Sequence, residues 1–201
     1  MTYTEDFKCI LAKQDNVVNA NLFILRNSNP KKIKVFPEEV SSVLLEKYFE
    51  TLSVTTDESE FVDFIPDTVE KNTLQVINTE VLDLWPAMVT AKDRLQNVNR
   101  AEITVEDYNC SGNTIMMDIE FDNGEHVYFL TVYRNVAAWY RNNICFTKKE
   151  TGKFHQQSGN VLALTPWVDA VIFDKKCYII NEVNFNSCLL YTSDAADEAR
   201  S

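Results

Sequence analysis

Three residues towards the end of the chain have an order that partly matches a nuclease signature, in which two carboxylates could hold a catalytic metal ion. Asp169 stands near the start of the apolar run "VDAVIFD", and Glu182 and Asn184 follow in "NEVN". Nucleases with metal-bound carboxylates often place an Asp on one hairpin strand and Glu-x-Lys on the next, because the lysine positions or activates water. Asn184 occupies the place of that lysine. A metal-dependent nuclease is therefore the lesser alternative. The other interpretation of these residues is an Asp at a strand edge and a Glu near a turn, without a catalytic role.

Other kinds of catalysis have little support in the sequence. The two histidines, His126 and His155, lie in no nucleophile-elbow or metal-ligand pattern. His126 lies beside the Asn-Gly turn, where we expect it to face solvent, and His155 is a loop residue or a phosphate contact. The four glycines form neither GxxxxGK nor GxGxxG, the loops that cradle nucleotide phosphates. We therefore expect no enzyme: no catalytic residue, no metal site and no cofactor.

A basic stretch with interleaved aromatic residues is more informative. "YRNVAAWYRNNICFTKKETGKFH" spans 133–155 and holds five basic residues against one acid. Cations spaced along a chain can neutralise DNA phosphates, a source of affinity that does not depend on base sequence. The alternative is a solvated, lysine-rich loop whose aromatic side chains belong to the core. The candidate DNA-binding residues are Arg134, Arg141, Lys148, Lys149 and Lys153.

The net charge of −11 is unevenly distributed along the chain. Residues 1–37 sum to +3, residues 38–125 to −15 and residues 126–176 to +4. A uniformly acidic protein would repel nucleic acid and anionic lipid, whereas this distribution leaves room for a local positive face. A smaller basic cluster is interpreted as a charged edge strand that discourages aggregation; it consists of Lys31, Lys32 and Lys34.

Cysteine usage and hydropathy indicate a cytoplasmic protein. The natural cysteines lack the paired spacing of metal sites and disulfide frameworks, so we expect reduced thiols; they are Cys9, Cys110, Cys145 and Cys177. No apolar run approaches the roughly 20 residues that span a bilayer. The start, "MTYTEDFKCILAK", has neither the basic end nor the apolar stretch of a secretory signal.

Hydrophobic periodicity and turn residues predict an α+β fold. The first part has a hairpin, a helix, two short strands and a second helix, over 16–36, 38–52, 61–66, 72–78 and 79–98. Pro86 implies that this second helix is kinked or starts near that residue. The second part is strand-rich and mostly antiparallel, with a hairpin around Asn123-Gly124, short strands at 143–146 and 160–165, and a final hairpin turning at 174–176. We divide the chain into parts 1–100 and 101–187, with one continuous domain as the alternative.

The last residues, "SCLLYTSDAADEARS" at 187–201, lose this pattern. Residues 188–198 resemble the translation of a transposon-end sequencing adapter. A segment of that origin lies outside any reasoning about the fold. We therefore expect a gene cut near Asn186 or Ser187, followed by a non-native, disordered tail at 188–201.

Four blocks of the chain resemble the successive blocks of KwaB-like proteins, the B component of the Kiwa anti-phage system. They are "NANLFILR", "FVDFIPD", "GEHVYFLTVYRN" and "VDAVIFDKKCYIINEVNF". The residues that match the family's last pattern are Asp169, Phe173, Tyr178, Ile179, Asn181 and Phe185. Two departures stand out: Asn186 replaces the glutamate that the family has after the phenylalanine, and the family's further C-terminal part is absent.

The resemblance implies a bacterial, cytoplasmic, non-enzymatic defence effector. Such a protein would bind double-stranded DNA without sequence specificity, associate with itself as a dimer, and dock on a KwaA-like membrane protein. It would then reach the membrane only through that partner. The alternative from the residues is a protein-interaction module, whose acidic middle contacts a partner and which binds no nucleic acid.

Overall fold

A computed structural model describes residues 1–25, 33–35, 42–66, 68, 70–82, 114–132, 144–146, 162–164 and 167–188. These residues form an eight-stranded sheet in the order β2-β1-β5-β6-β9-β10-β4-β3 and a separate pair, β7-β8. The strands are β1 (Val17–Leu25), β2 (Ile33–Val35), β3 (Glu60–Asp63), β4 (Thr73–Asn78), β5 (Thr114–Phe121), β6 (His126–Val132), β7 (Ile144–Phe146), β8 (Leu162–Leu164), β9 (Ala170–Phe173) and β10 (Lys176–Ile179). With helices at the N-terminus and mostly antiparallel pairing, the predicted α+β class is confirmed.

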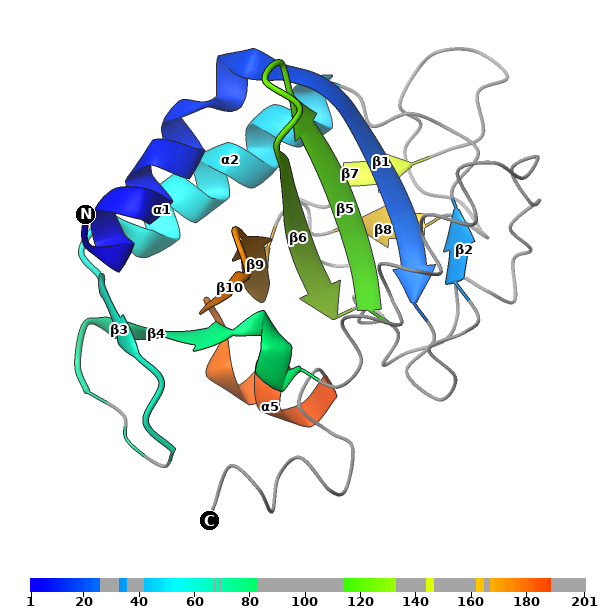
Figure 1. The fold of residues 1–201 in the computed structure, drawn as a ribbon. Helices are drawn as coiled ribbons and strands as arrows, with labels where there is room; N and C mark the ends of the chain where they lie inside the picture. Colours follow the sequence, from blue (N-terminus) through cyan, green and yellow to red (C-terminus); the bar gives the residue numbers. More distant parts are fainter. Residues whose placement is uncertain are drawn as a thin grey trace.

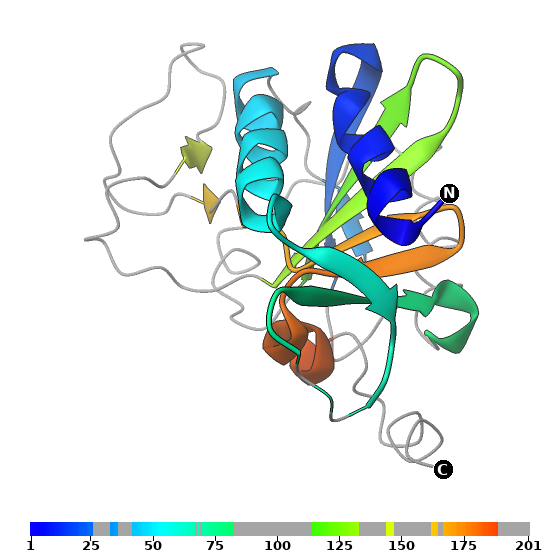
Figure 2. The same cartoon turned by 90° about the vertical axis from the view of Figure 1, so that its left-hand side faces the viewer.

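Two helices, α1 (Tyr3–Ala12) and α2 (Ser42–Thr56), lie side by side over one face of the sheet (Figures 1 and 2). The sequence periodicity predicted a helix over 38–52, and α2 continues four residues past that end. Helix α1 was not predicted. It begins with a capping box, in which Thr2 Oγ1 accepts from the Glu5 amide and the Glu5 carboxylate accepts from the Thr2 amide.

The larger core lies between these helices and the sheet. Alternate residues of each strand point towards the helices, as the period of two requires. Phe7 of α1 packs its ring 4.6 Å from Phe61 and 5.2 Å from Tyr178. On α2, Phe49 meets Phe129 edge-on at 5.2 Å. Aromatic contacts between segments far apart in the sequence therefore hold α1 and α2 against this face of the sheet.

The opposite face of the sheet holds a second apolar cluster with a short helix, α5 (Glu182–Cys188), against it. Phe185 of α5 is fully buried there among Ile77, Leu82 and Ile179. The sequence was interpreted as losing its pattern after Phe185, but the helix continues to Cys188, the first residue of the predicted non-native tail. Residues 189–201 lie outside the described part of the chain.

The predicted hairpins are confirmed. β1 pairs with β2, β5 with β6 and β9 with β10, all antiparallel. At the Asn123-Gly124 turn only Gly124 has positive φ, at 80°, which fits a type I turn followed by a left-handed glycine. The last hairpin turns at two residues, Asp174 and Lys175, with φ of 45° and 59°. Lys176, predicted as a turn residue, is the first residue of β10.

The sheet edge formed by β3 is partly blocked by α1. β3 pairs with β4 in parallel, and its other side faces the first turn of α1. There Thr4 Oγ1 accepts from the Phe61 amide at 2.9 Å, and the Tyr3 hydroxyl donates to Asp63 Oδ1 at 2.7 Å. A capped edge amide is unavailable to a strand of another chain.

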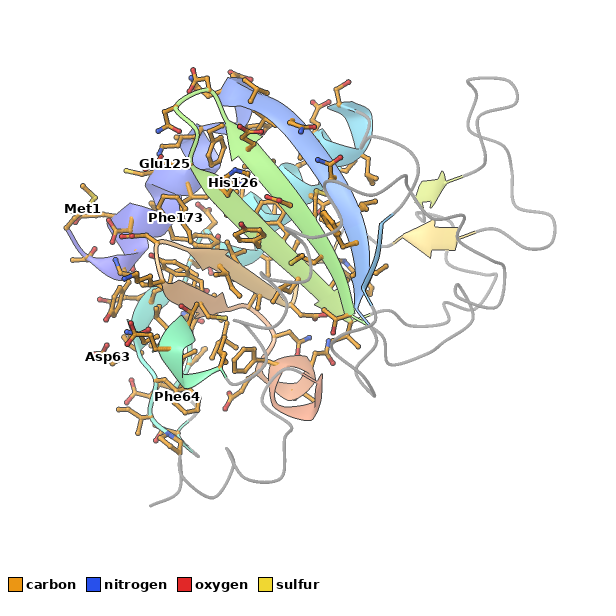
Figure 3. The ribbon with its side chains drawn as sticks, turned by 45° about the vertical axis from the view of Figure 1, so that its right-hand side comes forward. Met1, Asp63, Phe64, Glu125, His126 and Phe173 are labelled. Carbon is orange, nitrogen blue, oxygen red and sulfur yellow. The ribbon has the colours of Figure 1, made fainter. Side chains whose placement is uncertain are left out.

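A lysine just after α1 fastens that helix to the sheet. Lys13 Nζ lies 2.5 Å from Glu125 Oε2 and 5.5 Å from the ring centroids of both Phe121 and Phe173. Figure 3 shows Glu125 and Phe173 beside this helix. At the other end of α1, Asp6 and Lys176 form an ion pair at 3.0 Å.

Strands from both predicted parts, 1–100 and 101–187, belong to the same sheet: β1 pairs with β5, and β4 with β10. Of the helix predicted over 79–98, the described residues include only a short 3₁₀ turn at Thr79–Val81. The predicted strands at 143–146 and 160–165 correspond to β7 and β8, which pair with each other. Within the described ranges, no helix has the length and apolar character to cross a membrane.

Candidate functional site

Asp169 lies at the junction of β6 and β9, and its amide, its carbonyl and its carboxylate all make hydrogen bonds. Its amide donates to the Leu130 carbonyl at 2.8 Å, and its carboxylate Oδ2 accepts from the Val132 amide at 2.7 Å. Its carbonyl accepts from the amides of Ile180 and Asn181, at 2.9 and 3.0 Å. The side chain is buried, so these bonds offset part of the cost of removing a carboxylate from water.

Helix α5 supplies the second donor to this carboxylate. Asn184 Nδ2 donates to Asp169 Oδ1 at 2.6 Å, and both side chains are buried. Asn184 is held in place because Asn181 caps the helix: Asn181 Oδ1 accepts from the Asn184 amide at 3.2 Å. The Asp169 group, defined here as Asp169, Asn181 and Asn184, therefore joins two central strands to the last described helix.

Hydroxyl groups from α2 and β6 adjoin the Asp169 group. Thr131 Oγ1 donates to the Trp167 carbonyl at 2.9 Å. The Tyr48 hydroxyl is fully buried, and burial raises its pKa far above the usual range. A hydrogen bond with the Thr131 side chain opposes that rise in pKa, and the charge of Asp169 adds to it. Tyr48 therefore remains a neutral hydroxyl at physiological pH.

A cavity of about 330 Å³ opens beside these groups. Its wall combines polar side chains with a few apolar ones, contributed by α2, the end of β6, the approach to β9 and the start of α5. The lining residues are Thr51, Leu52, Thr55, Thr131, Val132, Trp167, Val168, Asp169, Ile180, Asn181 and Asn184. Ligand cavities in proteins start at about this size, so the space suits one small chemical group.

The structure brings together only part of the predicted nuclease signature. Asp169 and Asn184 are in contact, but Glu182 lines a separate depression of about 40 Å³ beside Glu70 and Gln75. In the described part of the chain, no group of three or more His, Cys, Asp or Glu side chains could hold a metal ion. Of the three residues in that signature, the structure joins Asp169 and Asn184 by a direct hydrogen bond and places Glu182 elsewhere.

His126 keeps 33% of its side chain exposed beside the turn and also contacts two residues of the sheet. Its Nδ1 lies 2.7 Å from Oδ1 of Asp118, which is buried. The ring is also stacked on Tyr128, 6.2 Å away between centroids. In Figure 3 His126 lies on the face of the sheet turned away from α1 and α2. The sequence did not indicate this partner, because Asp118 belongs to the neighbouring strand β5.

The predicted DNA-binding residues lie outside the described residues; they are Arg134, Arg141, Lys148, Lys149 and Lys153. The same holds for His155, Lys31 and Lys32, and Lys34 is placed on the edge strand β2. The structure does describe both ends of the segment 133–166. Val132 before it and Trp167 after it are held together by the Thr131 and Asp169 hydrogen bonds.

Sequence reasoning missed Tyr48, Thr131 and Trp167 as parts of one site. A usable indication was present for Asp169, since an acid inside the apolar run "WVDAVIF" must find partners when the run is buried. The sequence did not show which residues would be the partners, because contacting residues such as Thr131 and Trp167 are 36 residues apart.

Comparison of the chain with protein-family models, with curated protein sequences and with solved structures gave no match.

Proposed function

We propose that this protein is a non-enzymatic DNA-binding protein of the anti-phage defence type. In this proposal it binds duplex DNA without sequence preference through Arg134, Arg141, Lys148, Lys149 and Lys153. One observation carries the proposal. The segment 133–166 holds five basic residues and one acid, net +4, while the remainder of the chain sums to −15.

The anchoring of this segment supports the proposal. Its two ends are fastened side by side through Thr131, Val132, Trp167 and Asp169. A basic segment rooted at one place on an acidic body presents its charge locally, and repulsion from the body keeps DNA away from other surfaces. Phosphate contacts made in this way fix affinity and carry no base-sequence information.

The resemblance to KwaB-like proteins supports the remaining parts of the proposal. These are self-association as a dimer and docking on a KwaA-like membrane protein. In this proposal the protein works in the cytoplasm and reaches the membrane through that partner.

A salt titration of binding to random-sequence duplexes, followed by fluorescence anisotropy, tests the proposal. If about five phosphates are engaged, affinity falls roughly a hundredfold or more over a severalfold increase in salt. Changing Lys148, Lys149 and Lys153 to Glu should weaken binding to all sequences alike and flatten the salt dependence, because three phosphate contacts are lost.

A control variant with the same change in net charge distinguishes binding at a local site from a general effect of the protein's net charge. Lys8, Lys71 and Lys175 are exposed, and changing all three to Glu alters the net charge by the same amount. We expect this variant to bind DNA nearly as well as the parent protein. Equal loss in both variants would refute a local site, and no binding at low salt would refute DNA binding altogether. The result would then favour the protein-interaction module.

A further inference from the structure

We draw no further inference here: the strongest candidate, the depression of about 40 Å³ between β4 and the start of α5, carries nothing because among the described residues it rests on an acidic pair alone, Glu70 and Glu182, and the side-chain oxygen of Gln75 beside them is buried out of a ligand's reach.

Discussion

Exchanging the two partners of the buried pair, Asp169 and Asn184, tests how the site is built. In the double variant Asp169→Asn/Asn184→Asp, the asparagine placed on the strand side keeps an oxygen for the Val132 amide and turns its amide nitrogen towards the carboxylate placed on α5. Both hydrogen bonds seen at 2.7 and 2.6 Å are thereby preserved, with the charge moved to the other position. Each single change breaks this complementarity in a different way.

The size of each effect follows from what is left unpaired. Asp169→Asn sets two amide groups against each other and loses one charge-assisted hydrogen bond, at a cost of about 1.5–3 kcal/mol. Asn184→Asp places two buried carboxylates in contact, which we expect to cost about 3–5 kcal/mol at neutral pH. The double variant should be destabilised by no more than about 2 kcal/mol, so the coupling energy is favourable by at least about 2.5 kcal/mol.

The dependence on pH supplies an independent check. In Asn184→Asp the two carboxyl groups share a proton, so the folded pKa of the pair lies above the unfolded value. The destabilisation is therefore smallest in acid and grows as pH rises through the folded pKa. Urea unfolding followed by circular dichroism at pH 5 and pH 7 measures both quantities. If the double variant lost as much free energy of unfolding as the two single variants together, the reasoning would be refuted.

Three further changes test other parts of the fold. Gly124→Ala should destabilise by about 1 kcal/mol in urea unfolding and Gly124→Asn by less, because φ is 80° and a Cβ meets nothing within 4 Å; equal costs would mean that the turn relaxes. Tyr178→Phe should leave the melting temperature unchanged or raise it slightly, because among the described residues the buried hydroxyl has no hydrogen-bond partner; a loss above about 1 kcal/mol would show that it has one. Lys13→Met should cost about 1 kcal/mol at neutral pH. Its hydrogen bond with Glu125 is the main cause of the lowered pKa of that carboxyl. That contribution disappears as pH falls through the folded pKa, so the difference between parent and variant should narrow in acid, and a constant difference from pH 7 to pH 3 would contradict this account.

Local patterns predicted the local elements of the fold. Asn123-Gly124 between alternating apolar residues identified the β5–β6 hairpin, and three- and four-residue spacing identified α2. Helix α1 also has a local pattern, the Thr2–Glu5 capping box. It was missed because the start of the chain was considered only as a possible secretory signal.

The order of the strands and the partners in the site could not be predicted in the same way. β4 lies beside β10, about a hundred residues later in the chain, and nothing in either strand specifies that choice. Asp169 was singled out as a possible metal ligand and Asn184 as the residue in place of a lysine, but their direct contact depends on α5 turning back over the sheet. Long-range packing decides such contacts, and a single sequence shows only which residues need a partner.

The interleaved strand order has a consequence for the order of events during synthesis. α1 is made first, yet its Phe7 packs on Tyr178 and its Asp6 pairs with Lys176. Helix α1 cannot dock on β10 until the C-terminal hairpin has left the ribosome. We therefore expect the first half of the nascent chain to stay incompletely folded until then, with its apolar faces exposed to solvent. Ribosome-stalled chains ending before residue 170 should remain sensitive to protease. Chains with the whole of β10 outside the exit tunnel should become resistant in a single step.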